Sequence, residues 1–146
     1  MLSSSLPYYQ IHELASPVRG KTIRYFSKPG IPHWDEVSPA ERLLADVVES
    51  SVGGSILIFT DGPGALSVYL GSAFPDSSFC LTGNNALALE MAKRTIRSQQ
   101  IQNVSISSQI NLDSSLLASF TAAIICLPKG RKLARRWLRQ SWCGLQ

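Results

Sequence analysis

The chain has 146 residues, of which 45% are hydrophobic and 16% are charged, and its formal net charge at pH 7 is +4. This length suits one domain and this composition can bury a core, so a disordered chain and a long coiled coil are both excluded. The apolar runs are far shorter than the roughly 20 residues that cross a bilayer, and the first ten residues lack the features of a signal peptide. We therefore expect a cytoplasmic protein with no membrane partner.

The first elements in chain order are two short extended runs, residues 8–14 and 21–26, which are rich in aromatic and β-branched side chains. Pro17 and Gly20 predict a turn over the residues between them. We predict an N-terminal β arm with a linker over residues 1–37. The paired tyrosines of this arm are expected to cover the core, and stacking on nucleic-acid bases is their alternative role. These tyrosines are Tyr8 and Tyr9.

A helix is predicted to follow the arm. Ser38 is a good N-cap residue, Pro39 occupies the first helical position, and Glu41 completes a capping box. Apolar residues then repeat at helical spacing, which predicts one buried face. These residues are Leu43, Leu44, Val47 and Val48.

From here short apolar runs alternate with longer helical patterns. The apolar runs, each typical of a buried parallel strand, are residues 55–60, 77–82, 104–108 and 121–127. The helical patterns are residues 65–74, 85–98 and 130–140, and residues 111–119 are predicted as a loop or a short helix. This order is typical of right-handed βαβ units, so we predict an α/β fold with a parallel sheet of about four strands.

The cysteines and histidines indicate neither a disulfide framework nor a metal site. Cys80 and Cys126 lie in apolar runs, Cys143 lies near the terminus, and no CxxC pair occurs. His12 and His33 lie far apart, with no cysteine at ligand spacing. We predict a reducing compartment and no metal.

Positive charge is concentrated after residue 113. Residues 1–113 carry 8 basic and 10 acidic side chains, whereas the remainder carries 6 basic ones and no acid. Those basic residues are Lys129, Arg131, Lys132, Arg135, Arg136 and Arg139. Such a segment can bind the phosphates of RNA, and a solvated helix face is the alternative. Lys129 and Arg131 are the predicted substrate-binding residues.

The turn after residues 55–60 is the first candidate ligand site, because open α/β sheets bind ligands at the carboxyl ends of their strands. Gly62 and Gly64 flank Pro63 there. The dinucleotide pattern GxGxxG would need a glycine in place of Ser67 and an acid about 20 residues later, and neither is present. No GKS or GKT follows, so a Walker loop is also excluded. The glycines either bind another cofactor or only close a tight turn.

Four stretches occur in an informative order: GKTIRYFSKPGIPHWDEVSPAERLLADVV, GPGALSVYLGSAFP, NNALALEMAKRTI and IICLPKGRKLARRWL. In these stretches the chain resembles the small-domain class of S-adenosylmethionine-dependent methyltransferases, which includes ribosomal RNA guanine methyltransferases. The resemblance covers roughly residues 8 to 140. The resemblance implies a Rossmann-like class I methyltransferase fold over residues 38–146, with helices on both faces of the sheet. It also implies S-adenosylmethionine as cofactor and a base in RNA as methyl acceptor.

The resemblance also implies where the cofactor binds. Gly62 and Gly64 match the last two glycines of the family loop acid-x-Gly-x-Gly-x-Gly, but Thr60 replaces the first glycine and Ile58 replaces the acid. After the second strand, Gly83 stands where the family has an acid that holds the ribose hydroxyls.

The cofactor-binding residues that we predict are therefore Asp61, Gly62, Gly64, Asn84 and Asn85. In this set Asp61 is a substitute acid in an unusual position, and helix capping is the alternative role of the two asparagines.

The catalytic motif differs from that of the family. Members that methylate exocyclic amines carry Asn-Pro-Pro-aromatic after the fourth strand, and this chain has Cys126-Leu127-Pro128-Lys129. The sequence therefore does not identify the catalytic residues. The primary hypothesis is a methyltransferase acting on RNA. The alternatives are a non-catalytic domain that binds RNA or a protein partner, and an inactive truncated form.

The number of strands differs from that of the family as well. A complete sheet of this family has seven strands and only four are counted here, so we expect a domain that is incomplete at its C-terminus. A second chain, of this or another protein, is expected to cover the open sheet.

Overall fold

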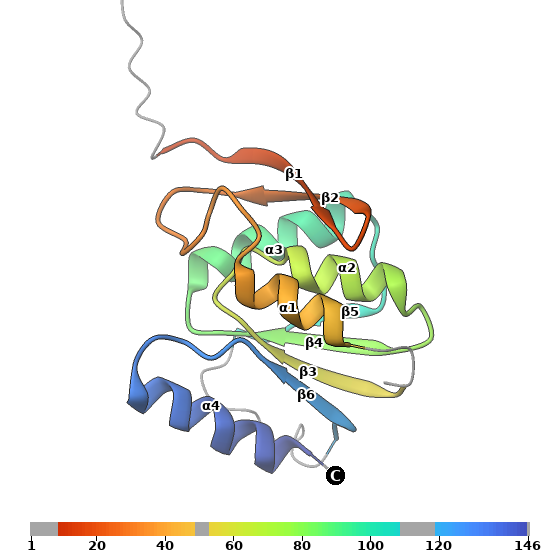
Figure 1. Ribbon diagram of the computed structural model, residues 1–146, viewed down its shortest axis with the longest axis vertical. Coiled ribbons are helices and arrows are strands. Elements are labelled where there is room, and N and C mark those ends of the chain that lie inside the picture. The colour runs from red at the N-terminus through yellow and green to blue at the C-terminus, as the bar shows by residue number, and fades with distance from the viewer. Residues whose placement is uncertain (1–8, 49–52, 109–118, 146) are drawn as a thin grey trace, which may run out of the picture.

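The computed structural model describes residues 9–48, 53–108 and 119–145 (Figure 1). Its elements are β1 (His12–Val18), β2 (Lys21–Ser27), α1 (Pro39–Val47), β3 (Ser55–Phe59), α2 (Ala65–Ala73), β4 (Ser78–Thr82), α3 (Ala86–Ser98), β5 (Val104–Ile106), β6 (Ala122–Ile125) and α4 (Arg131–Gly144). The loop or short helix predicted over residues 111–119 lies outside the described residues, except for residue 119. No helix in the described ranges is long and apolar enough to cross a membrane.

The central sheet has the order β5-β4-β3-β6, and every neighbouring pair of its strands is parallel. Helices α1, α2 and α3 cover one face of this sheet and α4 covers the other (Figure 1). The middle strand β3 is buried on both faces, since Ile56, Leu57 and Ile58 are all 0% exposed. The predicted α/β fold with a four-stranded parallel sheet is thus confirmed.

The two faces of the sheet bury separate groups of apolar side chains. The larger group fills the space between the sheet, the three helices and β2. The smaller group lies under α4, where Trp137 is buried and its ring centre lies 5.3 Å from that of Phe59. Burial of an aromatic ring of this size stabilises the fold by about 2–3 kcal/mol, so Trp137 anchors α4 to the sheet.

The N-terminal arm is an antiparallel hairpin of β1 and β2 that packs on the helical layer. The turn predicted between the runs is too long, because β1 continues through Pro17 to Val18 and only Arg19 and Gly20 form the turn. Both turn residues have positive φ, 46° and 77°, as two-residue hairpin turns require. Pro17 is tolerated because β1 is an edge strand.

Part of the buried face predicted for α1 is wrong. Leu43 and Val47 are 63% and 59% exposed, and the helix buries Glu41 and Ala45 instead.

Two expectations about chain ends are also wrong. Tyr9 is 70% exposed and does not cover the core, and Tyr8 lies outside the described residues. The last helix, predicted to end at residue 140, continues to Gly144 because Ser141 extends the buried face of Trp137 by one turn. The chain then turns back toward β6, where Leu145 forms a parallel bridge with Phe120.

Candidate functional site

The predicted cofactor residues lie at the carboxyl ends of β3 and β4. The Thr60 amide donates to the Thr82 carbonyl at 3.1 Å, which holds the two loops together just past the strands. The Asn84 amide donates to Asp61 Oδ1 at 3.3 Å. The structure therefore brings together the two loops that carry all five predicted positions.

A buried carboxyl group lies beneath the loop after β3. Glu41, on α1, is only 2% exposed. Its Oε1 accepts a hydrogen bond from Thr60 Oγ1 at 3.1 Å, and its Oε2 accepts one from Ser38 Oγ at 3.3 Å. Thr60 Oγ1 in turn accepts from the Gly62 amide at 3.0 Å. Glu41 thus orients the threonine hydroxyl that fixes the glycine loop.

Burial raises the pKa of Glu41 above its ordinary value, and the hydrogen bonds from Thr60 and Ser38 oppose this shift. The predicted capping box is confirmed, because the Glu41 amide donates to Ser38 Oγ at 3.2 Å and the Glu41 carboxylate accepts from the Ser38 amide. The contact between Glu41 and the glycine loop was not predicted. The capping pattern already accounts for this residue locally, so no separate signal in the sequence indicates the longer-range role.

Packing within the protein explains why residues 62 and 64 are glycines. A Cβ at residue 62 would overlap Glu41 Oε1. At residue 64 the backbone has φ 97°, and a Cβ would lie 2.7 Å from that of Ala92 on α3. Residue 64 therefore requires glycine, and a side chain at residue 62 would have to displace the buried Glu41 carboxylate. A cofactor role for Gly62 and Gly64 stays a prediction.

Residue 83, where the family has its ribose-binding acid, has no room for any side chain. A Cβ there would collide with the carbonyl oxygen of Thr60. Thr60 itself is held in place by the hydrogen bond from its amide to the Thr82 carbonyl. Asp61 Oδ1 lies 3.5 Å from the place where that Cβ would be. A carboxylate from the loop after β3 thus lies within van der Waals contact of the place where the side chain of residue 83 would begin.

The Asp61 carboxylate is held by the backbone of the loop after β4. It accepts hydrogen bonds from the amides of Asn84 and Asn85. Burial raises the pKa of Asp61, and these two bonds oppose the shift. Asp61 remains partly exposed, so a bound molecule can reach it.

The capping role is confirmed for Asn85. Its Oδ1 accepts from the Ala88 amide at 3.1 Å, at the N-terminus of α3. Asn84 is exposed. Contact of either side chain with a ribose stays a prediction.

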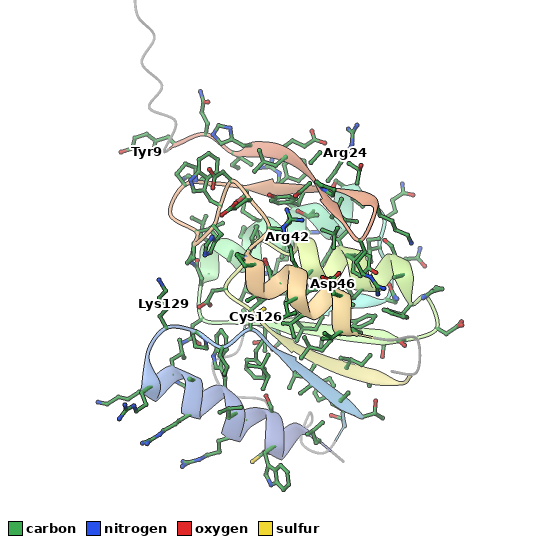
Figure 2. The ribbon with its side chains drawn as sticks, viewed as in Figure 1. Tyr9, Arg24, Arg42, Asp46, Cys126 and Lys129 are labelled. Carbon is green, nitrogen blue, oxygen red and sulfur yellow. The ribbon has the colours of Figure 1, made fainter. Side chains whose placement is uncertain are left out.

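The loop after β6 reaches the same edge of the sheet, where Figure 2 shows Cys126 and Lys129. Burial first and the charge of Glu41 second raise the pKa of Cys126 to about 12, so this thiol stays protonated near neutral pH and is a poor nucleophile. Leu127 is 59% exposed. Lys129 and Arg131 are exposed at the start of α4.

The basic side chains of α4 are on the surface that faces away from the sheet. A groove on this surface is lined by Lys132, Arg135, Arg136, Arg139 and Gln140. Trp137 occupies the buried face of the same helix. Among the described residues, no cluster of histidine, cysteine or acidic side chains could hold a metal ion.

The family described as methyltransferase small domain matches residues 22–130, which is most of the chain. The chain belongs to this family. Its members use S-adenosylmethionine, so the chain is a methyltransferase-like domain of that class.

Curated relatives include ribosomal RNA small subunit methyltransferase C from two bacteria. The Pasteurella multocida protein is 26% identical over 88 residues, which are 60% of this chain and 27% of that protein. The Haemophilus influenzae (strain PittEE) protein is 22% identical over 110 residues, which are 73% of this chain and 33% of that protein. The chain thus spans between a quarter and a third of the length of these relatives.

Solved structures show the same fold. The Thermus thermophilus 16S rRNA N2 G1207 methyltransferase, in complex with AdoMet and guanosine, aligns with a TM-score of 0.79 and 16% identity, over 93% of this chain and 39% of that chain. TYW2 of M. jannaschii, in complex with AdoMet, aligns with a TM-score of 0.66 and 15% identity, over 95% and 61% of the two chains. The predicted class I methyltransferase fold is confirmed.

Proposed function

We propose that this domain binds S-adenosylmethionine at the carboxyl ends of β3 and β4 and transfers its methyl group to a base in RNA. The observation that supports this proposal most is the position of Asp61. Its Oδ1 lies 3.5 Å from the place where a Cβ on residue 83 would be. The carboxyl edge of the sheet therefore carries an acid, although residue 83, where the family has its acid, is glycine in this chain.

The residues present fit the ribose of the cofactor. The Asp61 carboxylate can accept hydrogen bonds from two hydroxyl groups, and bonds to an ionised acceptor are about twice as strong as neutral ones. Its bonds to the Asn84 and Asn85 amides hold it in one orientation before any ligand arrives. Asn84, Asn85 and the glycine loop of Gly62 and Gly64 would form the rest of this site.

The bound cofactor would supply an electrophilic methyl group, and the chain would contribute the placement of the acceptor. Lys129 and Arg131 follow β6 at the same edge, so they would hold phosphates next to the target base. The other cations of α4 would extend this contact along the RNA. With no general base identified, rate enhancement would come mainly from positioning.

The test is transfer of a radiolabelled methyl group from S-adenosylmethionine to small-subunit ribosomal RNA, followed by digestion to nucleosides. We expect label on one base, and we expect Lys129→Gln/Arg131→Gln to lower kcat/KM for RNA by roughly tenfold, since two phosphate contacts are lost. The matched control Arg19→Gln/Lys21→Gln removes equal charge from the hairpin, at its turn and at the first residue of β2, and should change the rate less than twofold. Absence of labelled nucleoside with every RNA would contradict the proposed activity.

A second candidate function is a non-catalytic domain that binds RNA or a protein partner. It is favoured by the stretch Cys126–Lys129, which has neither the amide nor the aromatic ring of the family motif and whose thiol stays protonated. This candidate includes a second chain, of this or another protein, paired with β6, which is an edge strand among those described. RNA binding without methyl transfer would select it.

A further inference from the structure

A second surface of the molecule combines apolar, aromatic and cationic groups. A groove of about 680 Å³ lies between the hairpin and α3. Its apolar lining comes from Ile11, Phe26 and Met91, and its cationic lining comes from Arg94 and Arg97. We call it the arginine groove. It lies on the helical layer, on the opposite side of the sheet from α4 (Figure 1).

Two aromatic rings on this surface are close to cations. The guanidinium carbon of Arg94 lies 5.4 Å from the centre of the Phe26 ring. The Lys28 ammonium lies 6.0 Å from the centre of the Tyr9 ring, which is 70% exposed. Rings with neighbouring cations provide both a stacking face for a base and a charge for its phosphate.

The acidic groups near the groove are already close to basic ones. Glu90, the one acid in its lining, lies 3.9 Å from the Lys93 ammonium, and Glu13 on β1 lies 3.9 Å from Arg24. Arg94 and Arg97 are both exposed. The groove therefore presents net positive charge, which suits an anionic ligand.

The groove also has a direct connection to the candidate site. Helix α3 begins next to Asn85, at the carboxyl edge of the sheet, and the groove follows this same helix from Glu90 to Ser98. Figure 2 shows Tyr9 and Lys129 on the same side of the view, Tyr9 beside the hairpin and Lys129 near the start of α4. Helix α3 therefore links the carboxyl edge of the sheet to the groove.

We propose that the arginine groove binds single-stranded RNA adjacent to the nucleotide at the carboxyl edge. This inference rests on the proposed RNA substrate and adds a second contact surface to it. RNA is favoured over an acidic peptide because the exposed Tyr9 ring next to Lys28 offers a stacking face to a base while the arginines offer charge to phosphates, whereas carboxylates need only the cations.

The experiment measures the fluorescence anisotropy of a labelled single-stranded RNA of about 15 nucleotides as the complete chain is added, over a series of salt concentrations. We expect Arg94→Gln/Arg97→Gln to raise Kd roughly tenfold at 0.1 M salt and to reduce the salt slope by about 1.4, since each phosphate contact contributes about 0.7 for a single strand. Tyr9→Ala should raise Kd at least about fivefold by removing a stacking face. Circular dichroism melting of each variant confirms that it is folded.

Two further variants separate this inference from the proposed function. Arg19→Gln/Lys21→Gln removes equal charge outside the groove and should change Kd less than twofold. If Lys132→Gln/Arg135→Gln weakens binding while the groove variants bind like the unmodified chain, the RNA contacts α4 alone and the inference is wrong. If the unmodified chain binds no RNA, both proposals are wrong. If poly-glutamate displaces the labelled RNA as well as unlabelled RNA does, the inference about the groove is also wrong, because the groove would then select negative charge alone.

Discussion

Replacing Glu41 with alanine is expected to lower the free energy of unfolding by about 2–3 kcal/mol. The change leaves a cavity under the glycine loop and removes the acceptor of the Thr60 and Ser38 hydroxyls. Urea unfolding followed by circular dichroism measures the effect. Asp46→Ala is the matched control, because it removes an exposed acid from the same helix and should cost less than about 0.5 kcal/mol. An equal loss in both variants would mean that Glu41 has no special role in the loop.

The isosteric change Glu41→Gln tests the electrostatic part of the same argument. Because burial raises the pKa of Glu41, the folded protein binds a proton more tightly than the unfolded chain does. The stability from this proton is fully present below the ordinary pKa of 4.5 and is lost as the pH rises through the raised pKa. The unmodified protein should therefore lose stability over this window relative to Glu41→Gln, by at most about 1.4 kcal/mol per pH unit. Parallel pH profiles of the two proteins would contradict this cause.

The second large effect is expected at Gly83. Restoring the acid of the family by Gly83→Asp should destabilise the fold by about 3 kcal/mol, because any Cβ at this position collides with the Thr60 carbonyl. The bond between the Thr60 amide and the Thr82 carbonyl, next to the ladder of β3 and β4, prevents the loops from moving apart. Gly83→Ala should show most of the same loss, since the Cβ is the cause.

Thermal melting measures this effect, and the expected fall in Tm is roughly 10 °C for a chain of this size. Gly53→Ala is the control, because a Cβ there meets nothing within 4 Å. A Gly83→Asp protein that melts within about 2 °C of the unmodified one would show that the loops can separate and that the family acid could be accommodated.

Much of the fold could be predicted because its signals are local. The run at residues 55–60 is apolar enough to identify a strand that is buried on both faces, and β3 is such a strand. The end of α4 was less predictable, because it depends on the fit of Ser141 under the sheet. Pro17 was interpreted as part of a turn because the sequence does not show that β1 is an edge strand.

The location of the candidate site could be predicted from the sequence, but the contacts within the site could not. Parallel strands bring their carboxyl ends to one edge, so the meeting of the Asp61 loop with the Asn84 loop follows from strand order. The exclusion of a side chain at Gly83 depends on how closely Thr60 approaches, which is a tertiary distance. The position of the Asp61 carboxylate next to Gly83 also depends on the tertiary structure. It places an acid beside the residue at which the sequence alone shows that the family acid is missing.

Calorimetric titration with S-adenosylmethionine tests whether Asp61 takes the place of the family acid in holding the cofactor. We expect saturable binding by the unmodified chain and a Kd roughly 10- to 100-fold higher for Asp61→Asn, which keeps an oxygen for the Asn84 amide but loses the charge. Asp76→Asn, in the exposed turn before β4, should bind like the unmodified chain. No heat at millimolar S-adenosylmethionine, or equal affinity in the Asp61→Asn protein, would show that the Asp61 carboxylate does not hold this cofactor.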